Sequence, residues 1–348
     1  KEKFYSGEIS TEYLLKRGDL IIAMTDLIQN APILGSSAFI PQDGRFLHNQ
    51  RLGKVINLKV DRVLPEFLYY LFNTSNVRAH IKGSATGSTV RHTAPSRIYD
   101  VMVMLPPLPI QRRIAGILSA YDDLIENSQR RIKILETMAR ALYREWFVKF
   151  RFPGHESVRF VPSPLGDIPE GWEVTTLGRL VEIRKGKNIT KGTIHEGNVP
   201  VVAGGIAPSY YHDTSNTRSP VITISASGAN AGFINLYHVD VWASDCSYID
   251  LSATPHVFYY YLWLDHHRAT ITHLQRGSAQ PHVYPKDLAN LEAIGAPGEV
   301  LEAFLPLVTP VFGLVMRLAA KIEILRRTRD LLLPHLISGQ IDVEGIAS

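Results

Sequence analysis

Two long stretches of the chain repeat apolar residues in alternating steps of three and four. Residues 131–142 read RIKILETMARAL, and residues 321–332, which lie 190 positions later, read KIEILRRTRDLL. This spacing predicts two amphipathic helices of about 40 residues, each with an apolar seam that packs against another long helix. Leu124 and Leu307 are expected on the seam, together with Ile114, Tyr121, Leu135, Leu142, Phe304, Val311, Leu325 and Leu332.

Polar residues and proline modify this pattern at a few places. Arg329 falls on the seam, and we expect it to mark a contact with a partner protein. Asp122, Asp123 and Glu126 are interpreted as part of the solvated face of the first helix. Pro334 should kink or end the second helix, because proline lacks the backbone N–H that a helix needs.

The repeat extends beyond the helices. PEFLYYLF from Pro65 matches PHVFYYYL from Pro255, again 190 positions later, and both read as helices that begin at proline. In the next segment Gly83 matches Gly277 at a spacing of 194, so the spacing is expected to drift there. Apolar runs at 98–105 and 288–294 predict a strand before each long helix. The sequence therefore predicts two copies of one domain.

We predict a mixed α/β fold with a pseudo-two-fold internal repeat. Aligning GDLIIAMTD from Gly18 with SPVITISASG from Ser219 leaves the first copy about 35 residues short, so the native chain is expected to begin earlier. The predicted parts are a first domain at 1–108, a long helix at 109–150, a second domain at 151–298, a long helix at 299–337 and a tail at 338–348, with the two helices forming an antiparallel coiled coil between the domains.

Composition narrows the class of protein. The 348 residues include one cysteine, Cys246, which excludes an internal disulfide and is expected to be a small buried filler. No run of about 18 consecutive apolar residues and no signal peptide is found, so we expect a soluble, cytoplasmic protein. The net charge of +4 favours acidic partners such as nucleic acid only mildly.

Sequence motifs of catalysis are missing. The chain has no phosphate-binding loop, no Gly-x-Gly-x-x-Gly turn and no Glu-x-Lys. The segment at 105–108, LPPL, superficially resembles the motif of amino-methyltransferases but lacks its polar and aromatic residues, so it is interpreted as a strand exit. His256, His266, His267 and His273 are interpreted as surface residues rather than metal ligands, since only Asp265 lies nearby. We expect no catalytic residue and no metal site.

Polar loops recur at matching places in the two copies and predict DNA contacts. Arg, Lys, Gln, Asn, Ser and Thr are the residues that contact phosphates and base edges, although a merely solvated loop is an equal alternative for the cationic loop after Arg184. Tyr69, Tyr70 and Tyr259–Tyr261 are interpreted as packing rather than base-stacking residues. The predicted DNA-binding residues are His48, Asn49, Arg51, Lys82, Ser84, Thr86 and Arg91 in the first copy, and Arg184, Lys185, Lys187, Asn188, Lys191, Gln275, Arg276, Ser278, Gln280 and His282 in the second.

Three sequence motifs, taken together, make the chain resemble a known family. They are DIPEGW at 167–172, the LPPL exit at 105–108 followed by Ile110-Gln111, and LISGQI at 336–341. On a tandem repeat that covers nearly the whole chain, they resemble the specificity subunit of type I restriction–modification systems. The second long helix departs from that pattern, because Glu299-Val300-Leu301 stands where a glutamine-containing start is expected.

This resemblance implies a non-catalytic subunit that serves DNA methylation and phage defence. Two target-recognition domains would each read one half of a bipartite site in double-stranded DNA, held apart by helices about 60 Å long. Methyltransferase (modification) subunits would bring S-adenosylmethionine and methylate adenine N6, and restriction subunits would bring ATP and magnesium. No cofactor is expected on this chain, and no membrane partner.

Two other classes of function stay open at this point. One is a DNA methyltransferase or nuclease with its own active site, against which the missing motifs argue. The other is a scaffold that binds only protein through its coiled coil. Salt-sensitive DNA binding would separate the preferred class from the scaffold.

Overall fold

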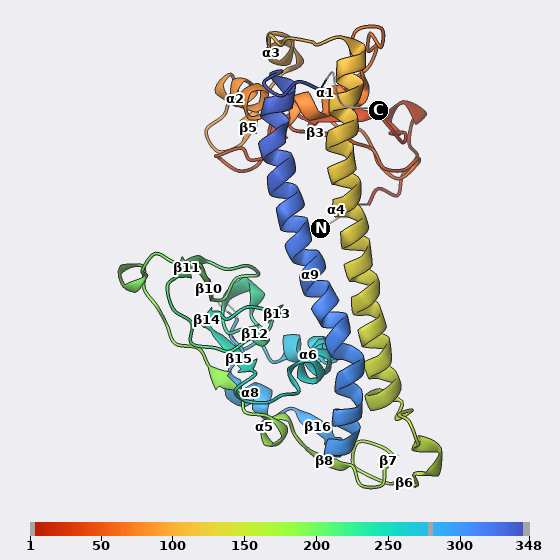
Figure 1. Ribbon diagram of the computed structural model, residues 1–348, viewed down its shortest axis with the longest axis vertical. Helices are drawn as coiled ribbons and strands as arrows, with labels where there is room; N and C mark the ends of the chain where they lie inside the picture. Colours follow the sequence, from red (N-terminus) through yellow and green to blue (C-terminus); the bar gives the residue numbers. More distant parts are fainter. Residues whose placement is uncertain (1–3, 278–280, 344–348) are drawn as a thin grey trace. The chain divides into compact units, whose positions relative to one another are not determined.

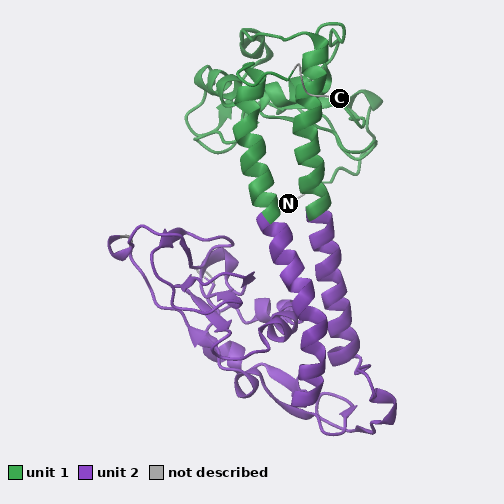
Figure 2. Ribbon diagram, in the orientation of Figure 1, with its two compact units in different colours: residues 1–128, 321–348 green, residues 129–320 purple. Residues whose placement is uncertain are grey.

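The computed structural model describes residues 4–277 and 281–343 of the chain. They form two compact units, in each of which residues from distant parts of the sequence meet. Unit 1 comprises residues 1–128 and 321–348, and unit 2 comprises residues 129–320 (Figure 2). Both units mix helices and strands, so the predicted mixed α/β class is confirmed.

Two long helices, α4 (Leu108–Tyr143) and α9 (Gly298–Ile337), contribute to both units (Figures 1 and 2). In unit 1 the beginning of α4 meets the end of α9, since Leu118 and Leu336 share one core. In unit 2 the segment just after α4 meets the beginning of α9, where the rings of Trp146 and Phe304 lie 5.4 Å apart. This pairing confirms the predicted antiparallel arrangement. A single π-helical turn, Arg144–Val148, extends α4.

The seam prediction is wrong at two positions. Leu124 and Leu307 are 45% and 46% exposed, and the neighbouring Ile125 and Val308 are buried instead. Buried positions on α9 recur in steps of four at Phe304, Val308 and Phe312, because a straight helix has 3.6 residues per turn and drifts from a heptad pattern. Of the eight other seam residues, Ile114 and Phe304 are buried, and Tyr121, Leu135, Leu142, Val311, Leu325 and Leu332 are half-buried.

Asp122 and Arg329 belong to a polar network in unit 1, whereas Asp123 and Glu126 are exposed, as predicted for the solvated face. Arg329 forms an ion pair with Asp122 and a second one, 2.8 Å long, with Asp330. The Tyr70 hydroxyl donates to the other Asp122 carboxylate oxygen at 2.7 Å. Burial first, and then this hydrogen bond, raise the pKa of Tyr70 well above its usual range. The interpretation of Asp122 as a solvated residue is therefore wrong, and Arg329 already has a partner within the chain.

Helix α9 does not end at Pro334, so the end predicted there is wrong, and the alternative, a kink, stays a prediction. The helix continues to Ile337, and the Pro334 carbonyl accepts a hydrogen bond from the Ser338 N–H at 3.0 Å. The missing N–H of Pro334 is tolerated because it would serve the carbonyl of Asp330, which lies on the exposed side of the helix where water can reach it.

One segment of α9 has a mean hydropathy of 1.8 and enough length to cross a membrane, although only 28% of it is buried. Length and composition alone are weak evidence for such a span. Helix α9 also places Phe304, Val308 and Phe312 in the core of unit 2, where they pack on domain residues. These contacts give this part of the helix a packing role within unit 2.

Unit 1 is built on a small antiparallel sheet. Strand β1 (Leu20–Ala23) lies between β3 (Ser37–Phe39) and β4 (Leu52–Lys54). Phe67, Ile81 and Leu34 are fully buried in the core of this unit. The other elements are the 3-10 turn η1 (Thr11–Tyr13), strands β2 (Thr25–Asp26) and β5 (Arg91–His92), and helices α1 (Pro65–Phe72), α2 (Ser75–Gly83) and α3 (Pro95–Tyr99).

Unit 2 contains two central sheets (Figure 1). The first has the order β13-β12-β15-β9 and the second the order β11-β10-β14. Cys246 is 2% exposed, and burial raises the pKa of its thiol to about 12, which confirms it as a buried filler. The strands are β6 (Phe160–Val161), β7 (Ile168–Pro169), β9 (Arg184–Lys185), β10 (Val199–Val202), β11 (Tyr210–His212), β12 (Val221–Ser225), β13 (Ile234–Tyr237), β14 (Trp242–Ala243) and β15 (Cys246–Asp250).

Short helices lie between the strands in the sequence of unit 2, and one of them carries its repeated tyrosines. They are α5 (Leu177–Leu180), α6 (Val257–His266), α7 (Arg268–His273) and α8 (Pro285–Ala289), with 3-10 turns η3 (His155–Ser157), η4 (Lys191–Thr193) and η5 (Gly228–Asn230). Tyr70, Tyr259 and Tyr260 are at most 5% exposed, so the interpretation of these tyrosines as packing residues is confirmed.

The two predicted strands before the long helices have different outcomes. In unit 2, β16 (Glu292–Gly295) pairs antiparallel with β8 (Glu173–Thr176), which follows the DIPEGW opening. In unit 1 the strand predicted at 98–105 is wrong, because α3 ends at Tyr99 and Met102 and Met104 are 91% and 85% exposed. No segment among the described residues of unit 1 supplies a strand equivalent to β8, and a strand needs a hydrogen-bonded neighbour to persist.

Replacing Phe304 tests the core of unit 2. The Phe304→Ala variant should lose about 3–5 kcal/mol of unfolding free energy, because it empties a fully buried site. The exposed Leu307→Ala variant is the matched control and should change stability by about 0.5 kcal/mol or less. All four tryptophans lie in unit 2, so urea unfolding followed by tryptophan fluorescence measures this unit. Equal losses for both variants would contradict the observed packing.

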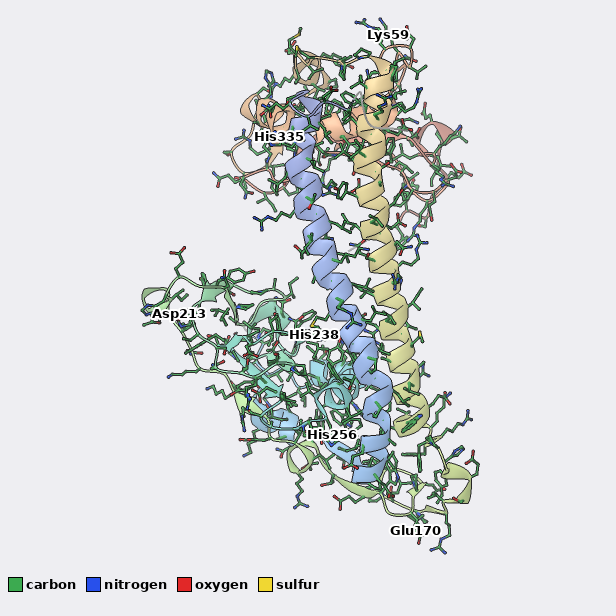
Figure 3. All side chains as sticks on the ribbon, in the orientation of Figure 1. Lys59, Glu170, Asp213, His238, His256 and His335 are labelled. Atoms are coloured by element: carbon green, nitrogen blue, oxygen red, sulfur yellow. The ribbon has the colours of Figure 1, made fainter. Side chains whose placement is uncertain are left out.

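Acid should weaken unit 2 before its carboxylates titrate. Burial lowers the pKa of His238, His256 and His267, which all lie in unit 2. His238 and His256 are labelled in Figure 3. The unfolded chain then binds protons more readily, so stability is full above the unfolded pKa of about 6.5 and falls as the pH drops below it. Urea unfolding at pH 7.5 and 5.5 should show this loss, and His267→Gln should reduce it. The exposed His273→Gln variant is the control. If His267→Gln loses as much stability between pH 7.5 and 5.5 as the original chain, His267 is not a source of the pH dependence.

Candidate nucleic-acid interface

Both units carry a polar hairpin at the same place in the repeat. The backbones of Thr86 and His92 form an isolated antiparallel β-bridge in unit 1, and those of Arg276 and His282 form one in unit 2. Gly87 and Gly277 follow the first residue of each bridge and have φ angles of +97° and +96°. A side chain at residue 87 would collide with the Val90 carbonyl. Gly87 is thus the true counterpart of Gly277, and the predicted drift of the spacing to 194 is wrong.

Each hairpin is tied to a second polar loop through the end of one strand. In unit 1 the Met24 N–H donates to the Arg51 carbonyl at 2.8 Å, and the Met24 carbonyl accepts from the Thr93 N–H at 2.9 Å. Ala226 makes the same two bonds in unit 2, to the Asp245 carbonyl at 3.2 Å and from the Val283 N–H at 3.0 Å. The fold therefore brings two polar loops, far apart in sequence, to one strand end in each unit.

A third polar loop joins this place in unit 2. The Gly186 N–H donates to the Cys246 carbonyl at 2.8 Å, and the Lys187 N–H donates to the Ala243 carbonyl at 2.9 Å. Any side chain at residue 186 would meet the Ser244 carbonyl, so glycine is required for this close approach. The predicted clusters around Lys187 and Arg276 thus converge with the loop at Asp245 on one surface of unit 2.

Several of the predicted guanidinium groups already have partners in the protein. Arg184 pairs with Glu182 at 2.7 Å and lies 3.7 Å from Asp250. Arg276 pairs with Asp287 at 2.7 Å. Arg91 donates to two backbone carbonyls just before its hairpin, those of Lys82 at the end of α2 and of Ala85. These contacts hold the loops in shape, and DNA contact by the three arginines stays a prediction.

The remaining predicted residues differ in their exposure. Gln275 donates to the Ala231 carbonyl at 2.8 Å, and a ring nitrogen of His48 lies 2.9 Å from the Leu52 carbonyl. Ser278 and Gln280 lie outside the described residues, as does the side chain of Lys191. Asn49, Arg51, Thr86, Lys185, Lys187 and Asn188 are exposed, and Lys82, Ser84 and His282 are half-buried.

Sequence reasoning missed residues that lie on or support the same surface. Ser227, next to the strand end, donates to the Asp245 carboxylate. The Asn216 side chain bonds both the N–H and the carbonyl of Ala243. Elsewhere in unit 2, Tyr210 and Tyr211 on β11 are 42% and 57% exposed. No periodic signal marks these positions, because each acts through a contact between segments distant in sequence.

Metal binding finds no support in the part of the chain that the structure describes. No group of three or more His, Cys, Asp or Glu side chains lies close enough to hold an ion there. His266 and His273 are exposed as expected, whereas His256 and His267 are half-buried. The His267 ring stacks on Trp263 at 3.9 Å, which gives it a packing role.

Comparison with known proteins agrees with the repeated site. The family model for the type I restriction modification DNA specificity domain matches residues 4–137 and again residues 169–294. The chain belongs to this family. It is therefore a DNA specificity subunit with two tandem recognition domains, and the family is not catalytic.

Individual relatives carry the same description. The type I restriction enzyme MjaIX specificity subunit of Methanocaldococcus jannaschii is 28% identical over 307 residues, which cover 82% of this chain and 71% of the relative. The MjaVIII specificity subunit of the same organism is 29% identical over 192 residues, or 53% of this chain and 44% of the relative. Among solved structures, the S subunit from M. genitalium matches the fold with a TM-score of 0.62 at 16% identity, over 93% of this chain and 84% of that one.

Lys187 provides the sharpest test of the interface. Its backbone is fixed by Ala243 and Trp242 while its side chain is exposed, so Lys187→Glu should leave the fold intact. We expect weaker binding to all DNA sequences and a salt slope smaller by about 1, as for a lost phosphate contact. Lys133→Glu on the exposed side of α4 makes the same charge change and is the control. Equal DNA affinity of the two variants, measured by fluorescence anisotropy at several salt concentrations, would remove Lys187 from the interface.

Proposed function

We propose that the two units read the two halves of a bipartite site in double-stranded DNA. The observation that supports this is the repeated site, in which a polar hairpin and a polar loop meet at one strand end in each unit. The frame is the same in both units, but Thr86 and Arg51 stand where the other unit has Arg276 and Asp245. Different side chains on one frame favour two different half-sites.

The charge of the site suits contact with a phosphate backbone. Lys185, Lys187 and Asn188 are exposed residues of the loop that contains Gly186. Backbone hydrogen bonds to Cys246 and Ala243 hold this loop in place. Cationic side chains fix the position of a protein on DNA, whereas side chains that reach base edges supply the sequence preference. Lys187 is therefore assigned to affinity, and the hairpin residues Arg276 and His282 to discrimination between bases.

The chemistry would come from other subunits. Methyltransferase (modification) subunits would bind S-adenosylmethionine and methylate adenine N6, and restriction subunits would use ATP and magnesium. Both kinds would assemble on the frame made by α4 and α9. The chain itself would hold no cofactor and would act in the cytoplasm, where the DNA and these partners are.

An exchange of one recognition domain tests this function. Residues 167–296 are replaced by the equivalent segment of a relative, the chain is co-expressed with its modification subunit in a host without DNA methylation, and modified adenines are mapped by sequencing. We expect two short specific blocks with a fixed spacer for the original chain, and a change in one block only after the exchange. A change in both blocks at once would refute the assignment of one half-site to each unit, and a stable complex without any methylated motif would favour the protein-only scaffold.

A further inference from the structure

The two ends of the helix pair differ at one matched pair of positions. The spacing of 190 relates Asp122 on α4 to Phe312 on α9, and Ala139 on α4 to Arg329 on α9. In unit 1 Asp122 and Arg329 form an ion pair. In unit 2 Phe312 and Ala139 are 2% and 1% exposed within the same core. At these matched positions unit 1 therefore has an ion pair, whereas unit 2 has two buried apolar residues.

The surroundings at each end match these residues. Phe312 stacks on Phe258 with ring centroids 4.7 Å apart and meets the edge of Tyr261 at 5.7 Å, so both of these neighbours are aromatic rings. In unit 1 one Asp122 oxygen accepts from Arg329 and the other from the Tyr70 hydroxyl at 2.7 Å. Each carboxylate oxygen thus has a donor, and Arg329 balances the charge of Asp122.

The internal repeat creates a choice of partner for each long helix. Because α4 and α9 carry the same apolar pattern, α4 of one copy could pair antiparallel with α4 of a second copy, and α9 with α9. The first pairing would place Asp122 opposite Ala139 of the second copy, without a cation. The second would place Arg329 opposite Phe312 of the second copy, with only Asp330 on its own helix as a partner. Only α4 with α9 satisfies both positions.

We propose that the Asp122–Arg329 ion pair selects pairing of α4 with α9 of the same chain over pairing of like helices from two copies. The side chains of Asp122 and Arg329 are 29% and 27% exposed, so most of each is withdrawn from water. Leaving one such charge without its partner is unfavourable, and polar seam residues select partners in this way in coiled coils. The Asp122–Arg329 ion pair therefore determines which helix packs against the apolar seam of α4. This role does not depend on the proposed DNA function.

Moving one arginine should invert the choice. The double variant Ala139→Arg, Arg329→Ala keeps the composition of the chain but puts Asp122 and the new arginine on the same helix. Two α4 helices would then form two ion pairs between Asp122 and the new arginine. Two α9 helices would pack Phe312 against the new alanine. Pairing of α4 with α9 would leave both Asp122 and the new arginine without a charged partner. Light scattering during size-exclusion chromatography of the full chain should give 38.9 kDa for the original chain and twice that mass for the variant. A folded, monomeric variant, or a dimeric original chain, would overturn the proposal.

A second variant keeps the proposal testable if the first does not fold. Asp122→Phe with Arg329→Ala copies the apolar pair of unit 2 into unit 1, so all helix pairings become equivalent. After refolding from denaturant, its dimer fraction should rise with protein concentration, whereas the original chain should stay monomeric. Asp122→Arg with Arg329→Asp reverses the ion pair and is the control that should also stay monomeric. A control that dimerises, or an Asp122→Phe, Arg329→Ala variant without dimer at any concentration, contradicts selection by the ion pair.

Discussion

The structure depends on the antiparallel packing of α4 against α9. Neither recognition unit has a complete core without both helices, since unit 1 uses Leu118 with Leu336 and unit 2 uses Trp146 with Phe304. Burial of these side chains supplies the main stabilisation, because apolar area removed from water is worth about 25 cal/mol per Å².

The architecture could be predicted because it follows from periodicity and repetition. Steps of three and four along residues 110–146 and 300–336 indicate long helices, and the spacing of 190 indicates two copies of one domain. Local patterns do not determine which neighbour each residue meets. Leu307 and Val308 are both apolar, and the slow rotation of the buried face along α9 decides that Val308 is inside. The strand at 98–105 failed for a related reason, because a strand requires a partner and not only a suitable sequence.

The candidate site could be predicted as a set of loops but not as a surface. Residue type indicated polar loops after Ile81, Arg184 and Gln275, and the fold brings those of unit 2 together. Type alone did not reveal that Arg184 and Arg276 are paired with Glu182 and Asp287, because those partners are recognised only in three dimensions. The supporting roles of Ser227 and Asn216 also arise from contacts across the sequence.

The division of the chain between the units has a consequence for its synthesis. Unit 2 is one continuous segment, residues 129–320, and can close its core as soon as that segment has emerged from the ribosome. Unit 1 also needs residues after 320, because Leu336 and Val343 complete its core. The first unit to be translated is thus the last to fold, and its apolar surface stays open while the whole of unit 2 is made. A nascent chain of this protein should therefore depend on chaperones most strongly at its N-terminal unit.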